Sequence, residues 1–556
     1  MSENGHVTVR FENGESVSIK KGEKVLDAIN MLKETPRDIF AININNRIHS
    51  VFHPVIIDSE CELITYGHTY GKKMYEISLK YIFLMALHFA YPEYKVRSFN
   101  KIGRNMFFNA VNFEPDEQFM ENISLLMHEI INAGLPIIKE TVRKEEAKIL
   151  YEEMGYECHI DNDNPFKDDY IVYYCDYDGS RYYNYLYDRL VPYTSCIKEF
   201  DVRLFKKGIL LMMPDRENPY LKSDVIETSR ITDSFDEFSN ILGILNINYV
   251  SDLNNIITND KIHEVIQLAE LDHSNRLFAC ASEIAASKTR VVLIAGPSSS
   301  GKTTFAKKLE VQLRLLKKRS LIVSMDDYFY DFKDSPLDET GSKNFDSINH
   351  LDIGLFRQHM TDLLEGRAVS IPKYNFRKNN GEKEYLSEPV AIQKETIIIA
   401  EGIHALNPKV SDFLSQEMKF KIYVAPMVTL SYDSSTKVSS NITRLVRRVV
   451  RDYMTRGALV EDTFLSWGNV KQGELENIFP FVDDADVIYN TNLVYEISAL
   501  KPLAENILRS IDVSSKWYYL AKQIYQTLQR FESIDTTKVP MNSILREFIG
   551  GGYFRY

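Results

Sequence analysis

The sequence predicts an α/β protein whose largest domain is a doubly wound parallel sheet, preceded by two smaller domains. Between residues 286 and 512, five short apolar runs (RVVLIAG, SLIVSMDD, TIIIAEG, FKIYVAP and ADVIYN) alternate with helical patterns. Continuous β-branched strands between helices are typical of a parallel sheet covered on both faces. Before residue 215 the pattern changes to alternating strands and mixed helices, and 556 residues are too many for one hydrophobic core.

The composition is that of an ordinary globular protein, with 44% hydrophobic and 26% charged residues. The net charge of −12 argues against a dedicated nucleic-acid binder. The polar start of the chain, and apolar runs of at most about a dozen residues, predict a cytoplasmic protein with no membrane span. The scattered cysteines form no CxxC pair, which indicates buried small residues in a reducing compartment. They are Cys61, Cys158, Cys175, Cys196 and Cys280.

Residues 1–66 predict a small domain. HVTVRF and SVSIKK alternate apolar and polar residues, with ENGE as the turn between them. EKVLDAINML then has helical spacing, and FAININN returns to a strand. This order of elements suggests a ubiquitin-like (β-grasp) fold, and it resembles the TGS module at the front of threonyl-tRNA synthetases.

Residues 67–215 predict an α+β domain, because helices such as YEISLKYIFLMALHF mix with strands such as DYIVYYCDY and GILLMMP. The order resembles the second added domain of threonyl-tRNA synthetases, in which His and Cys residues form an editing site. Here Ile77 and Tyr81 stand at the helix His positions, and Leu190 stands where a later His would be. We therefore expect a retained fold without the zinc and editing residues.

Two further regions are predicted to be mainly helical. Residues 216–285 are polar with helical spacing, and we interpret them as a helical linker. Residues 513–556 are interpreted as a C-terminal helix, beginning near SSKWYYLAKQIYQTLQRF, followed by a tail.

A phosphate-binding loop follows the first strand of the parallel sheet. GPSSSGKT, from Gly296 to Thr303, fits GxxxxGK[ST] at every fixed position. Its glycines let backbone N–H groups face an anion, and the helix that follows adds its dipole. Lys302 should reach the β and γ phosphates, and the Thr303 hydroxyl should bind Mg²⁺. We expect this loop to bind a nucleoside triphosphate, most simply ATP. The expected binding residues are Gly296, Ser298, Ser299, Ser300, Gly301, Lys302, Thr303 and Thr304.

Acidic residues end two later strands. Asp326 and Asp327 close SLIVSMDD at the carboxyl end of a parallel strand, where open α/β sheets bind ligands. Asp326 can accept a proton from an attacking hydroxyl or hold Mg²⁺, although a helix N-cap is the alternative role for this pair. Glu401 follows TIIIA, where P-loop proteins place an acid that supports Mg²⁺. A GTPase is disfavoured because the sequence has no NKxD motif.

A basic helix, NITRLVRRVVRDYMTRGA, follows the fourth strand. Its arginines at 444, 447, 448 and 451 have helical spacing along one side, and Arg456 comes just before Gly457. Alone, the pattern is typical of a solvated basic face. Beside a phosphate loop it predicts a lid that closes on the triphosphate and stabilises transition-state charge.

These segments together resemble the uridine kinase family, within the phosphoribulokinase/uridine kinase group. The motifs GPSSSGKTT, SMDDYFY, NFD at 344–346, IPKYNF, AEGIHAL and the lid occur in the family's order. The resemblance implies an ATP-dependent kinase that transfers the γ-phosphoryl group to the 5′-hydroxyl of a nucleoside, such as uridine or cytidine. As partners we expect a small-molecule acceptor and further copies of the chain in a homo-oligomer. We expect neither a membrane nor a nucleic acid as a partner.

The resemblance also implies roles for individual residues. Asp326 would be the general base, with Lys302, Arg451 and Arg456 neutralising the transferring group. Asp346 and Arg448 would hold the ribose, and Tyr374 and Phe376 would flank the base. Mg²⁺ would be surrounded by Thr303, Glu401 and Asp326.

This sequence departs from the family pattern near the base of the acceptor. No His follows YNF, and Trp467 stands where the family has Gln. Ala458 replaces a lid Arg, and SYDSSTKVSS is inserted before the lid helix. The phosphoryl-transfer machinery is therefore predicted to be kept, while Trp467 could stack on a base without reading its edge.

Several alternatives stay open at this point. The acceptor could be another small polyol or a sugar phosphate, and the donor could be GTP. The N-terminal half could bind RNA or the ribosome, with the kinase domain as a nucleotide-dependent switch, or it could sense a small molecule.

Overall fold

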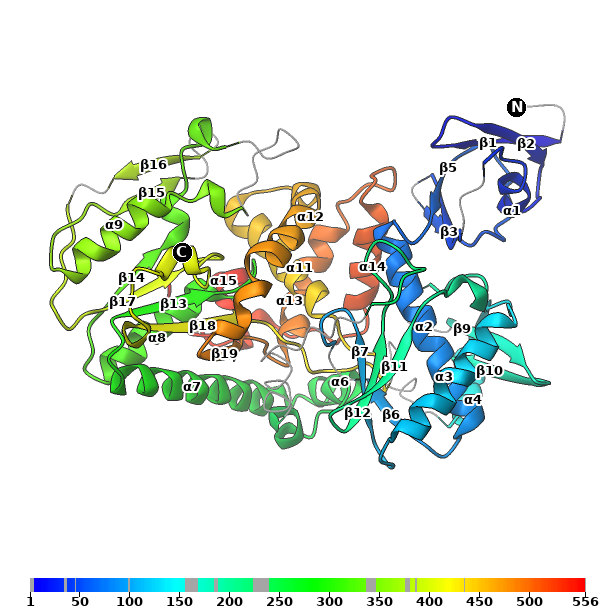
Figure 1. Ribbon diagram of the computed structural model, residues 1–556, viewed down its shortest axis with the longest axis horizontal. Helices are drawn as coiled ribbons and strands as arrows, with labels where there is room; N and C mark the ends of the chain where they lie inside the picture. Colours follow the sequence, from blue (N-terminus) through cyan, green and yellow to red (C-terminus); the bar gives the residue numbers. More distant parts are fainter. Residues whose placement is uncertain are drawn as a thin grey trace.

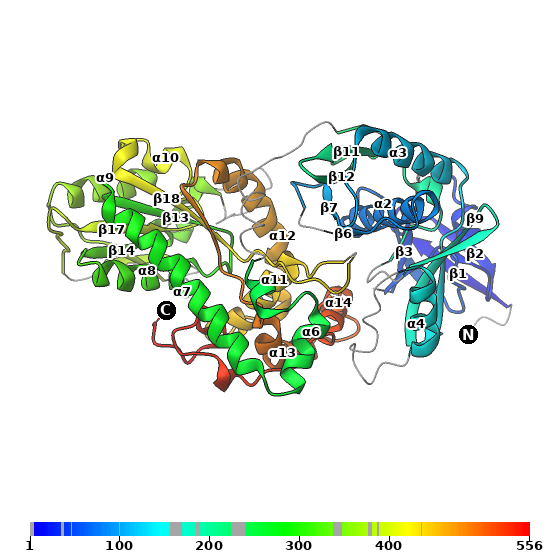
Figure 2. The same cartoon turned by 90° about the horizontal axis from the view of Figure 1, so that it is seen from below.

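The structure is a computed structural model that describes residues 5–34, 38–45, 47–98, 101–155, 169–184, 189–223, 240–336, 347–375, 381–385, 388–434 and 436–555. The chain forms two lobes, which Figures 1 and 2 show from two directions. The kinase lobe holds the parallel sheet, and the N-terminal lobe holds the elements before residue 215.

Within the described residues, five strands of the kinase lobe run parallel in one sheet. Each coincides with one of the apolar runs, so the predicted parallel sheet is confirmed. In spatial order the strands are β14 (Ser320–Ser324), β17 (Ile397–Glu401), β13 (Val291–Ala295), β18 (Lys419–Ala425) and β19 (Val487–Asn490).

Alternate residues of the central strand β13 enter two different cores, because successive side chains in a strand point to opposite faces. Val292 and Ile294 pack with Phe305 and other side chains of α7 (Ile262–Ala286) and α8 (Lys302–Leu315). Val291 and Leu293 pack on the other face with α9 (Ile353–Leu364). The sheet is thus covered by helices on both sides, as the doubly wound prediction requires.

Helix α7 lies in the region interpreted as a helical linker, yet it belongs to the kinase lobe. Leu277, Cys280 and Ile284 are buried against the sheet. Figure 1 shows α7 running the length of this lobe beneath the strands. The sequence pattern predicts the helix and does not reveal the surface that its apolar side covers. The shorter α6 (Val250–Thr258) precedes it.

The remaining kinase-lobe elements surround the sheet and its loops. A hairpin and a short helix precede the lid: β15 (Pro372–Asn375), β16 (Glu382–Tyr385) and α10 (Pro408–Ser411). The lid consists of α11 (Ser440–Arg451), a π-helical turn at Asp452–Arg456, and α12 (Val460–Asn477). The last helices are α13 (Glu496–Leu508), α14 (Tyr518–Leu528) and α15 (Arg546–Ile549).

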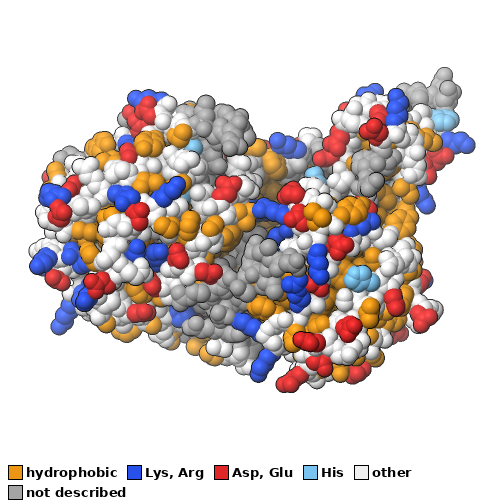
Figure 3. All heavy atoms as spheres, in the orientation of Figure 1, with side chains coloured by type: hydrophobic (Ala, Val, Ile, Leu, Met, Phe, Trp, Pro, Cys, Tyr) orange, Lys and Arg blue, Asp and Glu red, His pale blue; other side chains and the backbone are white. Residues whose placement is uncertain are grey.

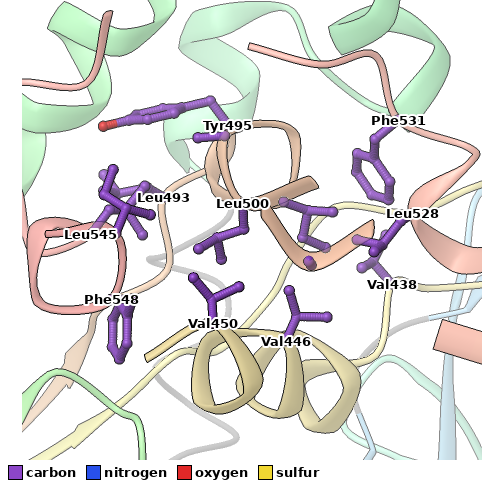
Figure 4. Close-up of a cluster of buried hydrophobic side chains, with 14 of the residues drawn as sticks. Val438, Val446, Val450, Leu493, Tyr495, Leu500, Leu528, Phe531, Leu545 and Phe548 are labelled. Atoms are coloured by element: carbon purple, nitrogen blue, oxygen red, sulfur yellow. The ribbon is translucent and has the colours of Figure 1, made fainter. Parts of the chain in front are cut away.

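The residues after 512 pack tightly on the lid helix. Figure 4 shows Val446 and Val450 of α11 in one cluster with Leu500 of α13 and with Leu528 and Phe548 near the end of the chain. Burial of each such side chain contributes about 1.5–3 kcal/mol. The predicted C-terminal helix is present, and the predicted tail is a packed part of this core.

The first described strands form a mixed sheet that packs on one short helix, α1 (Val25–Ile29). Strand β1 pairs in parallel with β5, and the other pairings are antiparallel. The predicted strands and helix are confirmed, and β4 and β5 complete the sheet. In order across the sheet the strands are β2 (Ser16–Lys20), β1 (His6–Phe11), β5 (Ser59–Ile64), β3 (Ala41–Ile44) and β4 (Arg47–His49).

The rest of the N-terminal lobe mixes helices with antiparallel sheets. The helices are α2 (Thr69–Ala90), α3 (Glu117–Asn132) and α4 (Lys144–Glu153). One described sheet has the order β11 (Asp201–Phe205), β12 (Gly208–Met212), β7 (Met106–Ala110), β6 (Val96–Ser98). The other has the order β10 (Ser180–Asn184), β9 (Asp169–Tyr177), β8 (Ile138–Arg143).

Helix α2 carries Tyr81 at one of the positions where the resemblance places a histidine. Tyr81 of α2 is fully buried and donates a hydrogen bond to the Tyr182 carbonyl at 3.2 Å. Cys61, Cys175, Cys196 and Cys280 are buried and free, while Cys158 lies outside the described residues. Among the helices in the described ranges, none has the length and apolarity to cross a bilayer.

The insertion before the lid helix connects the two lobes. The Ser98 N–H of β6 donates to the Ser434 carbonyl at 2.7 Å. The Lys80 ammonium on α2 donates to the Thr436 hydroxyl at 3.4 Å. The N-terminal lobe therefore holds the stretch of chain that leads directly into α11.

Candidate active site

The phosphate loop is shaped by two glycines. A Cβ on Gly296 would lie 2.0 Å from the Val424 carbonyl oxygen, so the loop can pass β18 only without a side chain there. Gly301 adopts φ +88°, the left-handed conformation that favours glycine, immediately before α8 begins at Lys302. The loop thereby turns from β13 into α8 and leaves the first N–H groups of the helix available for an anion.

Several polar groups of this loop are available to bind a ligand. The Lys302 ammonium folds back and donates to the Gly296 and Pro297 carbonyls at 2.9 and 3.2 Å. The hydroxyls of Ser299 and Ser300 are buried, and neither has a hydrogen-bond partner within the described ranges. Because buried hydroxyls are normally paired, the loop fits a ligand rich in acceptor oxygens.

Arginines of the lid helix hold the loop from behind. The Arg444 Nε donates to the Ser298 carbonyl at 3.2 Å, and Arg448 donates to the Ser298 hydroxyl at 2.9 Å. Arg447 is fully buried and donates to the carbonyls of Ser299 and Ser300, both at 3.5 Å.

The predicted lid arginines thus fall into two functional groups, and Arg444 and Arg447 form the first. Arg444 and Arg447 are neutralised by buried carboxylates, Glu474 and Glu496 respectively. Because both guanidiniums are committed to these ion pairs and to loop carbonyls, they anchor the lid to the loop.

A buried aspartate gathers the other lid arginines. Asp452 carboxylate oxygens lie 3.3 Å from Arg448, 2.8 Å from Arg451 and 3.5 Å from Arg456. Burial tends to raise the pKa of Asp452, but the three guanidiniums outweigh it and the pKa is lowered. Sequence reasoning missed this residue, although an acid between closely spaced arginines was a usable signal.

Two carboxylates face the loop from the ends of neighbouring strands. Glu401 is 6% exposed, and its Oε1 accepts hydrogen bonds from the Thr303 and Ser324 hydroxyls at 3.3 and 3.2 Å. Burial raises the pKa of Glu401 to about 7; the charge of Asp326 adds to this, and Lys302 opposes it. Asp326 and Lys302 are therefore close enough to Glu401 to affect its pKa.

Asp326 follows β14 and lies within electrostatic reach of the lid. Burial raises the pKa of its carboxyl, while Lys302, Arg456 and Arg451 lower it. A raised pKa is the direction that makes a carboxylate a better proton acceptor near neutral pH. The structure thus brings together the four residues that the sequence predicts to be catalytic.

The donor set fits Mg²⁺ bound together with a triphosphate. Mg²⁺ prefers oxygen ligands and is usually held by one or two carboxylates plus substrate phosphates. Thr303, Glu401 and Asp326 supply a hydroxyl and two carboxylates at the mouth of the loop. No group of three or more His, Cys, Asp or Glu in the described part of the chain could hold a metal alone, so phosphate oxygens would complete the coordination.

Asp327 is turned away from this centre and has a structural role. Its carboxylate accepts hydrogen bonds from the Tyr374 N–H at 3.0 Å and from the Lys373 ammonium at 3.2 Å. It therefore anchors β15 to the end of β14. Tyr374 is itself buried, and its hydroxyl donates to the Tyr330 carbonyl at 3.3 Å.

Trp467 of the lid helix α12 is buried in the core that α12 shares with α11. It is 6% exposed, and the Arg444 guanidinium lies 5.2 Å from its ring centroid. A base could stack on this ring only if Arg444 moved, so this placement does not favour the predicted stacking. Asp346 and Phe376, the other predicted acceptor contacts, lie outside the described residues.

Two buried histidines beside the site were not singled out in the sequence. His350 and His404 are each 2% exposed, and both ring nitrogens of His404 lack a hydrogen-bond partner among the described residues. Burial lowers the pKa of His404 to about 4, with Lys302 and His350 contributing. The usable signal was local, because His404 follows Glu401 by three positions in AEGIHAL.

Comparison with known proteins agrees with this geometry. The family model described as "Phosphoribulokinase / Uridine kinase family" matches residues 291–498. A uridine kinase of Staphylococcus haemolyticus is 31% identical over 202 residues, which cover 36% of this chain and 86% of that protein. A uridine kinase of Halobacterium salinarum is 28% identical over 199 residues, covering 35% of this chain and 77% of that protein.

A solved structure of a possible uridine kinase from Bacillus stearothermophilus is also similar, with 18% identity and a TM-score of 0.26. It covers 39% of this chain and 98% of its own. The region of this chain that matches the family model, residues 291–498, contains the phosphate loop, both acidic strand ends and the lid. Through this kinase lobe, the chain belongs to the phosphoribulokinase/uridine kinase family.

Proposed function

We propose that the protein is an ATP-dependent kinase that transfers the γ-phosphoryl group to the 5′-hydroxyl of a nucleoside of the uridine or cytidine type. The observation that carries this proposal is the meeting of Asp326, Glu401, Lys302 and the lid arginines at the carboxyl end of a parallel sheet, beside a phosphate loop. Such an arrangement provides a base, a metal site and positive charge around one transferring group.

Each group has a distinct task. The loop N–H groups and Lys302 hold the phosphates, and Asp326 accepts the proton of the attacking hydroxyl. Arg451 and Arg456 stabilise the charge that develops on the transferring oxygens. When bound at Thr303, Glu401 and Asp326, Mg²⁺ neutralises phosphate charge and orients the phosphates.

The acceptor contacts are proposed from the family pattern. Asp346 and Arg448 would hold ribose hydroxyls, and Tyr374 and Phe376 would flank the base. Arg448 supports this role by its position, because it joins the Ser298 hydroxyl of the loop to Asp452 of the lid. Another polyol or a sugar phosphate is the competing acceptor, and GTP is the competing donor.

For the N-terminal lobe we propose a TGS-like β-grasp domain at 1–66 and an α+β domain at 67–215 that lacks the editing residues. The strand order and the buried Tyr81 support this reading. A role in binding RNA is less favoured, because on the face in Figure 3 the described basic side chains are interspersed with acidic ones. We further propose a cytoplasmic homo-oligomer.

The test is a phosphorylation screen of nucleosides, polyols and sugar phosphates with Mg²⁺ and either ATP or GTP, with Lys302→Ala as the blank. We expect at least one ribonucleoside to be phosphorylated. Asp326→Asn should lower kcat by roughly 10²–10⁴-fold. Asp327→Asn is the matched control and should cost much less, because Asp327 contacts β15 instead of the loop.

Product formation only from a non-nucleoside acceptor would replace the proposed substrate by its competitor. Turnover that does not exceed the Lys302→Ala blank with any acceptor would remove the kinase assignment.

A further inference from the structure

Residues 540–553, here called the closing segment, form a compact element. Arg546 donates hydrogen bonds to the carbonyls of Pro540 at 3.4 Å and Gly550 at 3.1 Å. The Tyr553 N–H donates to the Met541 carbonyl at 3.0 Å, so the segment closes on itself. A self-braced element of this kind presents its side chains at defined positions.

The closing segment is part of the core of the kinase lobe. Ile544, Leu545, Phe548 and Ile549 are all buried. Figure 4 shows Leu545 beside Leu493, and Phe548 to the left of Val450 of α11. Because moving the segment would expose these side chains to water, the segment is expected to stay in place during binding.

The same segment reaches the phosphate loop. A Cβ on Gly301 would lie 2.7 Å from Ile544 Cδ1, so the loop and the segment are in direct contact. The Phe548 ring lies 5.0 Å from the guanidinium of Arg447, whose other partners include loop carbonyls. The Lys307 ammonium of α8 donates to the Arg555 carbonyl just beyond the segment.

Glu547 of this segment binds the start of α8. Its Oε2 accepts hydrogen bonds from the Thr304 N–H at 3.1 Å and from the Thr304 hydroxyl at 2.5 Å. Thr304 is the third residue of α8, so its N–H is one of the first donors at the N-terminus of the helix. In a phosphate loop the N–H groups at this helix end point to phosphate oxygens.

We infer that the Glu547 carboxylate occupies a phosphate subsite of the loop and must withdraw from Thr304 before the inner phosphate of a nucleoside triphosphate can bind there. This inference rests on the proposed nucleotide site. Two anions cannot share the Thr304 donors, and a carboxylate that stays nearby repels the triphosphate. Glu547 therefore sets the affinity of the site for nucleotide.

The position of Glu547 also implies selectivity between phosphate ligands. Pyrophosphate is short enough to bind at Lys302 and Thr303 alone, which places it before Thr304 in the loop. It does not require the donors that Glu547 holds. Glu547 should consequently weaken the binding of nucleoside triphosphates and have little effect on the binding of pyrophosphate.

The test uses Glu547→Gln in the full chain, since glutamine keeps the size and an acceptor oxygen but removes the charge. Binding of adenylyl imidodiphosphate and of pyrophosphate, each with Mg²⁺, is measured by calorimetry. We expect the Kd for the nucleotide analogue to fall on the order of tenfold, and the Kd for pyrophosphate to change less than about twofold. Glu532→Gln is the matched control, because Glu532 is tied through its backbone to Asn254, and should leave both values unchanged.

Unchanged or weaker nucleotide binding in Glu547→Gln would overturn the inference, as would equal tightening of both ligands. Glu547→Ala provides a second variant if the first unfolds, and the same tightening is expected. If the wild type binds pyrophosphate or nucleotide and only the Glu547 effect is missing, the proposed function stands. If neither the wild type nor any variant binds either ligand, the proposed function fails and the inference falls with it.

Discussion

Glu401 and Asp326 show how burial prepares individual residues for chemistry. Each carboxyl is desolvated, each is in the field of the other, and Lys302 opposes both effects. The ligand-free protein therefore holds more negative charge in this pocket than its surroundings favour. A divalent cation bound between the two carboxylates would relieve that imbalance by adding positive charge.

The raised pKa of Glu401, about 7, predicts a pH-dependent stability. The folded protein binds more protons than the unfolded chain between about pH 4.5 and 7, so stability falls as pH rises through this window. Glu401→Gln should remove this loss, which is on the order of 3 kcal/mol. Urea unfolding at pH 5 and pH 8 without Mg²⁺ measures it.

Glu417→Gln is the control for this measurement, because Glu417 is exposed and pairs with Lys288 at the surface. It should preserve the pH dependence of the wild type. If the wild type and Glu401→Gln lose stability in parallel, Glu401 does not titrate in this window.

Substitution of His404 by an apolar residue is predicted to stabilise the folded protein. Its ring nitrogens are buried without partners among the described residues, and its lowered pKa keeps the ring neutral near pH 7. His404→Leu should therefore raise the free energy of unfolding of the ligand-free protein by about 1–3 kcal/mol. Denaturant unfolding at pH 7 checks the sign.

His359→Leu is the contrasting control. His359 is hydrogen-bonded to the Tyr328 hydroxyl at 3.1 Å, so its loss leaves that hydroxyl unsatisfied and should not stabilise the protein. A His404→Leu variant that is less stable than the wild type would mean that the imidazole has a partner in the folded protein.

At the scale of elements, the lid helix α11 and the π-helical turn that follows it combine anchoring and reactive arginines. Arg447 is fully buried against Glu496, whereas Arg456 is 56% exposed at the end of the π-helical turn. Both belong to the arginine-rich segment NITRLVRRVVRDYMTRGA, and their packing separates their functions.

This division predicts opposite phenotypes for two substitutions. Arg447→Met should lower the free energy of unfolding by about 3–5 kcal/mol, because it leaves the Glu496 charge buried and unpaired. Arg456→Met should change stability by less than about 0.5 kcal/mol and lower kcat by roughly 10²–10³-fold. Urea unfolding and steady-state kinetics of both variants separate the two effects; a stable, inactive Arg447→Met would contradict the anchoring role.

At the scale of the whole molecule, the insertion SYDSSTKVSS, residues 431–440, connects the N-terminal lobe to the lid. It contacts β6 through Ser98 and α2 through Lys80, and its last residue, Ser440, is the first residue of α11. The position of the lid is thus mechanically linked to a lobe outside the family match.

Lys80→Ala should loosen this connection. Loss of its contact with Thr436 lowers the free energy of opening the insertion by about 1–2 kcal/mol. This change corresponds to roughly tenfold more frequent opening. Limited trypsin cleavage at Lys437 should accelerate by that factor. Lys72→Ala is the control, since Lys72 lies on the same helix α2 and pairs with Glu217; equal cleavage rates in all three proteins would show that Lys80 does not restrain the loop.

Local pattern was sufficient for much of this fold. The runs at β13 and β17 predict buried parallel strands, and GPSSSGKT predicts the loop between them, because periodicity and glycine chemistry act over a few neighbouring residues. Strand β4 was not predicted because it has only three residues, and β5 and the packing of α7 were not predicted because their partners lie far away in the sequence.

The sequence by itself determined the sheet, the phosphate loop and the acids at the strand ends, because each depends on contiguous residues and on the fixed geometry of parallel strands. Only the tertiary structure decided that Trp467 is buried under Arg444, that Asp452 collects the lid arginines, and that Glu547 reaches Thr304 from 243 residues away. Burial and long-range pairing are properties of the packed chain, and no local pattern of side chains encodes which distant group will arrive.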